Sequence, residues 1–112
     1  MSTGIAAITA ERKRQIEAEA WTPEHDDEHD AGEMAGAASA YALSAACQIS
    51  PYAEPLDEVP DAFPHTWSQE WWKPKTARED LVRAGALIAA EIDRLDREAS
   101  ALFVDDGHDE AT

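Results

Sequence analysis

Cysteine, long apolar runs and basic residues are all scarce in this chain. Its 112 residues include one cysteine, Cys47, which excludes an internal disulfide and agrees with a reducing compartment. No apolar run approaches the roughly 20 residues of a membrane-spanning helix, and no basic segment followed by an apolar stretch marks a signal peptide. We therefore expect a cytoplasmic protein that does not associate with membranes.

The shortage of basic residues limits the partners of the chain. It has 9 lysines and arginines against 24 acidic residues, for a net charge of −15. Residues 24–33 carry six acids and no base, whereas residues 67–104 are nearly neutral, with seven acids and six bases. Duplex DNA is disfavoured as a partner because its binding needs clustered cations that displace counterions. Basic partners or cations are favoured, unless the acids serve only to keep a small protein soluble.

The composition favours a small all-α domain. Hydrophobic residues make up 44% of the chain, and many are alanines, which lose no side-chain entropy in a helix. We predict one domain over residues 1–104, a small bundle of three main helices with a thin core, followed by a disordered acidic tail at 105–112. The first helix is predicted over residues 2–20, where isoleucines are spaced among charged residues, and Trp21 closes it.

The second helix is predicted to begin at Thr22 and to continue to about Cys47. Threonine is a favourable N-cap, and the proline and acids that follow it suit the first helical turn. Gly32 and Gly36 weaken this helix but permit close approach by a neighbouring segment. Spacings of four, three and four predict one apolar packing stripe, formed by Met34, Ala38, Tyr41 and Ala45.

A Pro-rich acidic loop separates the second and third helices. Four prolines between residues 50 and 64 exclude a regular element there, and we place the whole connection at about residues 50–75. Thr76 and Glu79 form a capping box that begins the third helix. Alternating spacings of four and three then predict one seam that faces one partner: Leu81, Gly85, Ile88, Ile92, Leu95, Ala99 and Leu102. Because two short helices cannot cover this seam, we expect a homodimer or higher oligomer.

The acidic segment at residues 24–33 is the first candidate site. In a continuous helix, its two histidines and Glu33 would lie on one face at i, i+4 and i+8, and the aspartates would add oxygen ligands. The predicted ligands of Mg²⁺ or Mn²⁺ are His25, Asp26, Asp27, His29 and Glu33. The alternative is a solvated acidic helix start that the helix dipole stabilises.

A wider metal interpretation adds carboxylates from the first and third helices, namely Glu17, Glu19, Glu91 and Asp93. The pattern partly resembles the MazG-like family of all-α nucleotide pyrophosphohydrolases, which pair an E-E-x-x-E element with an E-x-x-D element to hold magnesium. Residues 24–27 match E-x-x-D, but the chain contains no E-E-x-x-E. The resemblance implies metal-dependent hydrolysis of a nucleoside triphosphate.

Tryptophans followed by cations form the second candidate site. The predicted ligand-binding residues are Trp21, Trp67, Trp71, Trp72, Lys73, Lys75 and Arg78. Such rings can stack on a base while neighbouring cations meet phosphate. The rings can equally form a lid over an alanine core, and we expect this packing role to dominate.

Much of the chain resembles a group of small proteins of tailed bacteriophages and prophages. The segments that carry the resemblance are residues 11–16, 21–29, 32–34, 71–75, 80–88 and 91–95, with the motifs W-T-P-E-H-D-D and A-G-A-L-I-x-x-E-I-D-R-L. Ala20 departs from the glycine expected before Trp21. The resemblance implies a phage or prophage source and the cytoplasm of a bacterial host, but it lends no activity.

These observations favour a phage-type accessory protein that binds and does not catalyse. The small size, the concentrated acidic charge and the lack of a complete catalytic set suggest that it binds a host protein or other macromolecule, or a small anionic, nucleotide-like ligand, and so interferes with a host process. One alternative is a MazG-like pyrophosphohydrolase. Another is a purely structural helical oligomer built on the third-helix seam.

Overall fold

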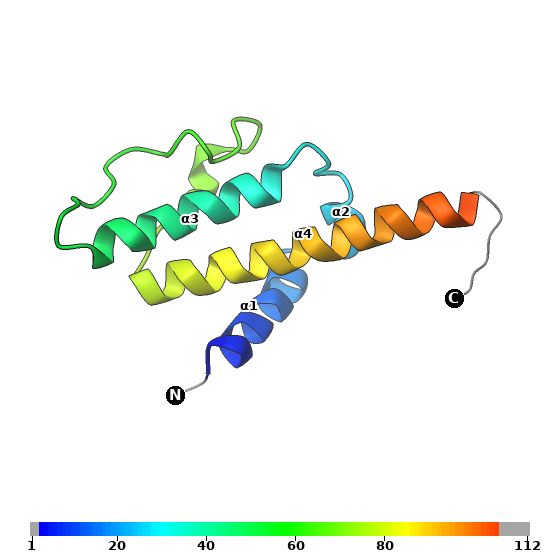
Figure 1. Cartoon of the computed structure of the whole chain (residues 1–112), viewed down its shortest axis with the longest axis horizontal. Coiled ribbons are helices and arrows are strands. Elements are labelled where there is room, and N and C mark those ends of the chain that lie inside the picture. The colour runs from blue at the N-terminus through cyan, green and yellow to red at the C-terminus, as the bar shows by residue number, and fades with distance from the viewer. Residues whose placement is uncertain (1–2, 106–112) are drawn as a thin grey trace.

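The computed structural model describes residues 3–105 of the chain (Figure 1). Within them lie the helices α1 (Gly4–Ala18), α2 (Pro23–Asp26), α3 (Glu33–Ile49) and α4 (Ala77–Asp105) and the 3-10 helix η1 (Gln69–Trp71), without any strand. The predicted all-α fold of three main helices is confirmed, with α1, α3 and α4 as those helices. None of the described helices is long and apolar enough to cross a membrane. The predicted tail lies outside the described residues, apart from Asp105 at the end of α4.

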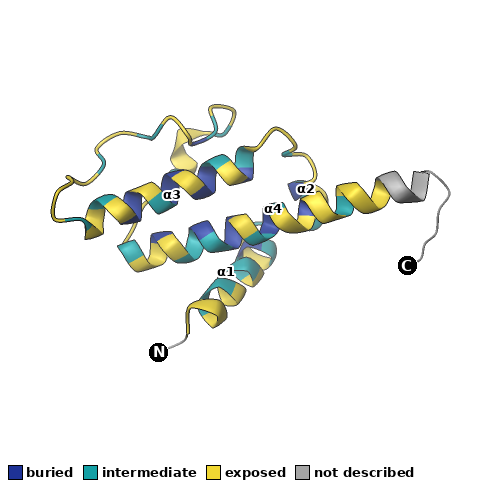
Figure 2. Ribbon diagram, viewed as in Figure 1, coloured by how far each residue is buried: buried dark blue, intermediate teal, exposed yellow. Residues whose placement is uncertain are grey.

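Helix α4 is the central element of the fold. Each of the other three α-helices packs against it (Figure 1). The core lies mainly between α3 and α4, where Figure 2 shows the buried residues gathered on the facing sides of the two helices. The predicted stripe of α3 is confirmed, because each of its four residues is at most 2% exposed: Met34, Ala38, Tyr41 and Ala45. Alanines on α4, including Ala84 and Ala90, let the two helices approach closely.

The prediction of one continuous helix from Thr22 to about Cys47 is wrong between residues 27 and 32. The start is as expected, because the Thr22 hydroxyl accepts a hydrogen bond from the backbone N–H of His25. Helix α2 nevertheless ends at Asp26, and Gly32 has a φ of 84°, in the left-handed region that favours glycine. A continuous helix would also hold six acids together over residues 24–33, which repel one another.

Helix α1 ends in a left-handed residue that is not glycine. Ala20 has a φ of 58° and is the one described non-glycine residue with a positive φ. The backbone N–H groups of Glu19 and Trp21 both donate to the carbonyl of Gln15, at 3.2 and 3.0 Å. A left-handed residue directly after the last turn is a common helix end, and glycine is the usual residue there. This preference accounts for the glycine expected at position 20.

The long connection between α3 and α4 is held to the helices at its middle and at its end. Phe63 is buried in the core, and the carbonyl oxygen of Ala62 lies so close to α3 that a Cβ on Gly36 would be 2.5 Å from it. The predicted capping box is confirmed at the start of α4, where the backbone N–H groups of Thr76 and Glu79 each donate to the other's side chain. The hydrogen bonds from Thr76 lower the pKa of Glu79.

Candidate functional site

Three tryptophans and two histidines line a pocket of about 310 Å³. Trp21 precedes α2, while Trp67 and Trp71 come from the segment around η1. The ring centroid of Trp21 lies 6.1 Å from that of Trp67 and 5.9 Å from that of Trp71. The ring centroid of His29 lies 5.2 Å from that of Trp67, and the ring centroid of His25 lies 4.9 Å from that of His29. The volume falls near the lower end of the range of small-molecule sites, roughly 300 to 1,000 Å³.

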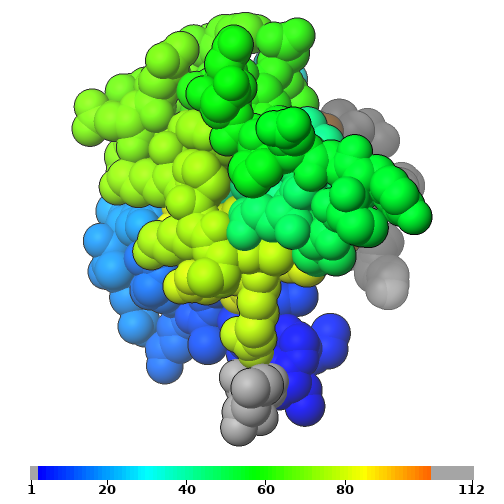
Figure 3. Space-filling view, turned by 90° about the vertical axis from the view of Figure 1, so that its left-hand side faces the viewer, coloured from blue at the N-terminus to red at the C-terminus, as the bar shows by residue number. Residues whose placement is uncertain are grey.

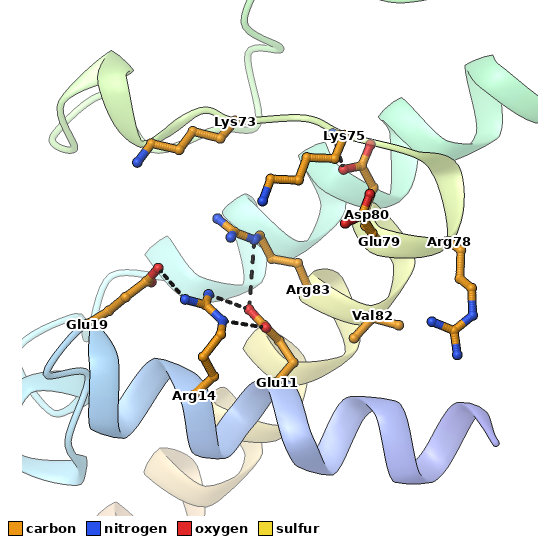
Figure 4. A pocket seen from close by; sticks show the side chains of 10 residues that line it. All are labelled: Glu11, Arg14, Glu19, Lys73, Lys75, Arg78, Glu79, Asp80, Val82 and Arg83. Carbon is orange, nitrogen blue, oxygen red and sulfur yellow. Dashed lines mark hydrogen bonds and ion pairs between the residues drawn. The ribbon is translucent and has the colours of Figure 1, made fainter. Parts of the chain in front are cut away.

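A second pocket, of about 380 Å³, gathers most of the cations of the chain (Figure 4). The five that line it are Arg14, Lys73, Lys75, Arg78 and Arg83, out of 9 lysines and arginines in the whole sequence. They come from α1, from the segment after η1 and from α4. Figure 3 views the molecule from this end, where the yellow-green residues around the start of α4 stand beside the blue residues of α1. We call this the basic pocket and the first one the aromatic pocket.

Ion pairs with Glu11 and Glu19 neutralise two of these cations, Arg14 and Arg83. Glu11 accepts from Arg14 at 2.8 Å and lies 3.9 Å from Arg83, and Glu19 accepts from Arg14 at 2.9 Å. Burial raises the pKa of Glu11, but the hydrogen bonds and charge of Arg14 and the charge of Arg83 outweigh this and hold the pKa below its ordinary value. Among the described residues, the ammonium groups of the two lysines at positions 73 and 75 make no ion pair.

Helix α3 fixes the backbone that carries these lysines. The hydroxyl of Tyr41 donates to the carbonyl of Trp71 at 2.8 Å and accepts from the backbone N–H of Lys73 at 3.0 Å. The carboxylate of Asp80, 2% exposed, accepts from the backbone N–H of Lys75 at 2.7 Å. It also accepts from Ser44 and Gln48 of α3, each at 2.9 Å. These bonds join α3, α4 and the segment after η1 into one support for the site.

The aromatic and basic pockets adjoin each other. Glu19 lines both of them, and the ammonium group of Lys73 lies 5.5 Å from the ring centroid of Trp71. Two buried polar atoms beside the aromatic pocket, Oε1 of Glu19 and Nε1 of Trp67, have no hydrogen-bond partner among the described residues. The junction therefore combines ring faces, cations, one acceptor and one donor.

Six of the seven predicted ligand-binding residues line these pockets. Trp72 is the exception, because it packs against Tyr41 and Phe63 in the core, with centroid distances of 4.8 and 5.5 Å. Trp21 and Trp67 pack against the same core with one part of their surface. Trp71 remains 39% exposed. Trp72 thus has a packing role, whereas Trp21, Trp67 and Trp71 line a pocket, and a ligand there stays a prediction.

The predicted metal ligands are separated by the break between α2 and α3. Asp26 is 1% exposed and accepts from Arg12 of α1 at 2.7 Å. Burial raises the pKa of Asp26, and the charge and hydrogen bond of Arg12 only partly oppose this rise. Asp27 accepts from Arg97 of α4, also at 2.7 Å, and Glu33 accepts from the backbone N–H of Ala31.

Only the two histidines of the predicted metal site meet, with 3.3 Å between their Nε2 atoms. Two of the four carboxylates of the wider metal interpretation are also engaged, with Glu19 bound to Arg14 and Glu91 bound to Arg94. In the part of the chain that the structure describes, no three His, Cys, Asp or Glu side chains are grouped to hold a metal ion. The Mg²⁺ or Mn²⁺ site stays a prediction without geometric support.

Two cations of the basic pocket were not predicted from the sequence, Arg14 of α1 and Arg83 of α4. Arg14 and Arg83 are far apart in the sequence and meet only through Glu11, as Figure 4 shows. The sequence held one signal for Arg14. Bases are rare in this chain, and residues 12–14 hold three of its 9 lysines and arginines.

Comparisons with protein-family models, with curated proteins and with solved structures find no match for this chain. The geometry and chemistry of the two pockets are therefore the basis for assigning a function.

Proposed function

We propose that this chain is a phage-type accessory protein that binds a phosphorylated, nucleotide-like small molecule. The base would lie against the aromatic pocket and the phosphates would lie in the basic pocket. One observation carries the proposal: a chain with a net charge of −15 places five of its 9 lysines and arginines around one pocket, which adjoins three tryptophans. Binding of such a compound would withdraw it from host metabolism and so interfere with a host process.

The chemistry of the two pockets supports this division of the ligand. Stacking of a base on an aromatic side chain contributes about 1 to 3 kcal/mol, and it tolerates different bases because every base has a π-face. Lysine and arginine form charge-assisted hydrogen bonds to phosphate oxygens. Lys73 stands between the pockets, over the ring of Trp71, where a sugar joins a base to its phosphates.

The charge of the rest of the molecule favours a small ligand over a nucleic acid. A long nucleic acid needs many phosphate contacts along its backbone, and the acids outside the basic pocket would repel it. A nucleotide places its few charges in the basic pocket alone. The host macromolecule named as an alternative target has no comparable support among the described residues.

Isothermal titration calorimetry with three probes tests the proposal. A nucleoside triphosphate carries both recognition elements, the matching nucleoside carries the base alone, and inorganic triphosphate carries the charge alone. We expect the nucleoside triphosphate to bind more tightly than either fragment. Equal affinity for inorganic triphosphate would contradict a role for the tryptophans.

Matched variants assign the two halves of the site. Trp71→Ala should lower affinity for the nucleoside triphosphate by about 1 to 3 kcal/mol, whereas Tyr52→Ala, which removes a ring that is 96% exposed, should not. Lys73→Ala should weaken binding of both phosphate-bearing probes, whereas Lys13→Ala, outside the pocket, should not. Loss of affinity in the control variants would contradict the proposed site.

The same samples distinguish binding from hydrolysis. Pyrophosphate release is measured with the nucleoside triphosphate in the presence of Mg²⁺ or Mn²⁺. We expect binding without turnover, because each carboxylate that lines the basic pocket is held by a partner within the protein. Glu11 and Glu19 are bound to Arg14, Glu79 to Thr76, and Asp80 to Ser44 and Gln48. Turnover that requires the metal and is lost in Asp26→Asn with Asp27→Asn would replace the proposal with the hydrolase alternative.

A further inference from the structure

Two histidine side chains meet at the aromatic pocket. The Nε2 atoms of His25 and His29 lie 3.3 Å apart, and the two ring planes stand at 84° to each other. Both side chains are half-buried, and both line the open pocket of about 310 Å³. The proposed base site uses the faces of the tryptophans and neither imidazole. Histidine nitrogens are the commonest metal ligands in proteins, so this pair is a candidate for a metal ion.

The distances within the pair fit one shared ion. An imidazole nitrogen binds Zn²⁺ at about 2.0 to 2.1 Å, and two such bonds at a tetrahedral angle hold their nitrogens about 3.3 Å apart. An ion in the plane of both rings would place the ring centroids about 5 Å apart, and they are 4.9 Å apart. The alternative is a direct hydrogen bond, but N–H···O bonds in proteins span about 2.7 to 3.2 Å. The separation of 3.3 Å is therefore long for a hydrogen bond and close to the value for a shared ion.

The backbone holds the two histidines in this arrangement before any ion binds. The Thr22 hydroxyl accepts from the backbone N–H of His25 at 3.3 Å, and the backbone N–H of His29 donates to the carbonyl of Asp26 at 3.0 Å. The side chain of Asp26 is in turn bound to Arg12 of α1. Ligands that are already held in place lose little conformational entropy on binding, which favours affinity.

Imidazole selects a different class of ion from the carboxylates of this segment. It suits Zn²⁺, Cu²⁺ and Ni²⁺, whereas Mg²⁺ and Mn²⁺ prefer carboxylate oxygens. Asp26 and Asp27 are engaged by arginines, and within residues 3–105 no third His, Cys, Asp or Glu side chain joins the pair. Water from the pocket would therefore fill the remaining coordination positions. We propose that His25 and His29 together bind one transition-metal ion, and that Cu²⁺ binds most tightly.

Copper titration of the full chain tests this site, because bound Cu²⁺ quenches the fluorescence of a neighbouring tryptophan. The ring centroid of Trp67 lies 5.2 Å from that of His29. We expect saturable quenching at one Cu²⁺ per chain. No nucleotide is added, so the result is independent of the proposed ligand site. Excess Mg²⁺ should not displace the copper. Displacement by Mg²⁺, or quenching that does not saturate, would overturn the inference.

Matched histidine variants locate the ion. His29→Gln should abolish the saturable quenching and leave the helical circular dichroism unchanged, since the side chain is only half-buried. The control is His65→Gln, which removes an exposed histidine two residues from Trp67 and should leave the quenching intact. Electron paramagnetic resonance of the wild-type Cu²⁺ complex should show hyperfine coupling to two imidazole nitrogens. Coupling to fewer than two, quenching that persists in His29→Gln, or equal loss in the control would each overturn the inference.

Discussion

The backbone of Ala20 is strained in a way that one substitution relieves. A left-handed residue with a Cβ costs about 1 to 2 kcal/mol, and glycine avoids this cost while losing some chain entropy. We predict that Ala20→Gly raises the free energy of unfolding by roughly 0.5 to 1 kcal/mol, measured by urea denaturation. The matched control is Ala18→Gly, at the last residue of α1, which should lower it. Destabilisation by Ala20→Gly would contradict the left-handed end of α1.

The buried carboxyl of Asp26 makes stability depend on pH in a defined direction. Burial raises its pKa above the ordinary value of 3.8, so its contribution to stability is fully present below pH 3.8 and is lost as the pH rises through the folded-state pKa. Asparagine does not titrate. We therefore predict that Asp26→Asn gains stability relative to the wild type as the pH rises above 3.8, measured by urea denaturation across the acidic range. A relative stability that falls with rising pH would show that Arg12 dominates over burial.

At the scale of elements, the contact between α3 and the long loop depends on the absence of one side chain. A Cβ on Gly36 would meet the backbone oxygen of Ala62, which cannot move aside as a flexible side chain would. We predict that Gly36→Ala lowers the free energy of unfolding by roughly 1 to 3 kcal/mol, the usual cost of overpacking.

Gly4→Ala is the control for this substitution, because nothing lies within 4 Å of a Cβ at that position. It should stabilise the chain by roughly 0.5 to 1 kcal/mol, the difference between the two residues in a helix. Equal effects of the two substitutions in urea denaturation would contradict the close contact at Gly36.

Local signals were enough to predict most element boundaries but not the break between α2 and α3. The N-cap at Thr22 and the capping box at Thr76 act within one helical turn, so both could be recognised from neighbouring residues. Asp26 and Asp27 are held by arginines of α1 and α4. These contacts depend on tertiary packing, and a helical periodicity does not reveal them.

Tertiary packing also decides which face of α4 stays exposed, and the helical periodicity did not reveal this either. The heptad pattern was recognised, but the face that packs within the chain holds alanines and Leu87. Alanines give a weak signal in a hydrophobicity pattern although they permit the closest helix contact.

At the scale of the whole molecule, the candidate site was half predictable. Trp67, Trp71, Lys73 and Lys75 lie close together in the sequence, and their composition alone indicated a ligand site or a packed cluster. The sequence did not show which tryptophan packs against the core and which lines a pocket. Trp71 and Trp72 are neighbours in the chain and differ only in the direction that each side chain faces. The arginines of α1 and α4 come to the site through the packing of both helices around Glu11.

The indole N–H signals of the four tryptophans give the most direct test of the proposed ligand site. In a two-dimensional ¹H–¹⁵N spectrum of the full chain, a nucleoside triphosphate should shift the signals of Trp21, Trp67 and Trp71, which line the aromatic pocket. The signal of Trp72, in the core, serves as the internal control and should stay unchanged. Saturable shifts of the three signals alone are the predicted result. No shift at any indole, or a shift confined to Trp72, would contradict the proposed site.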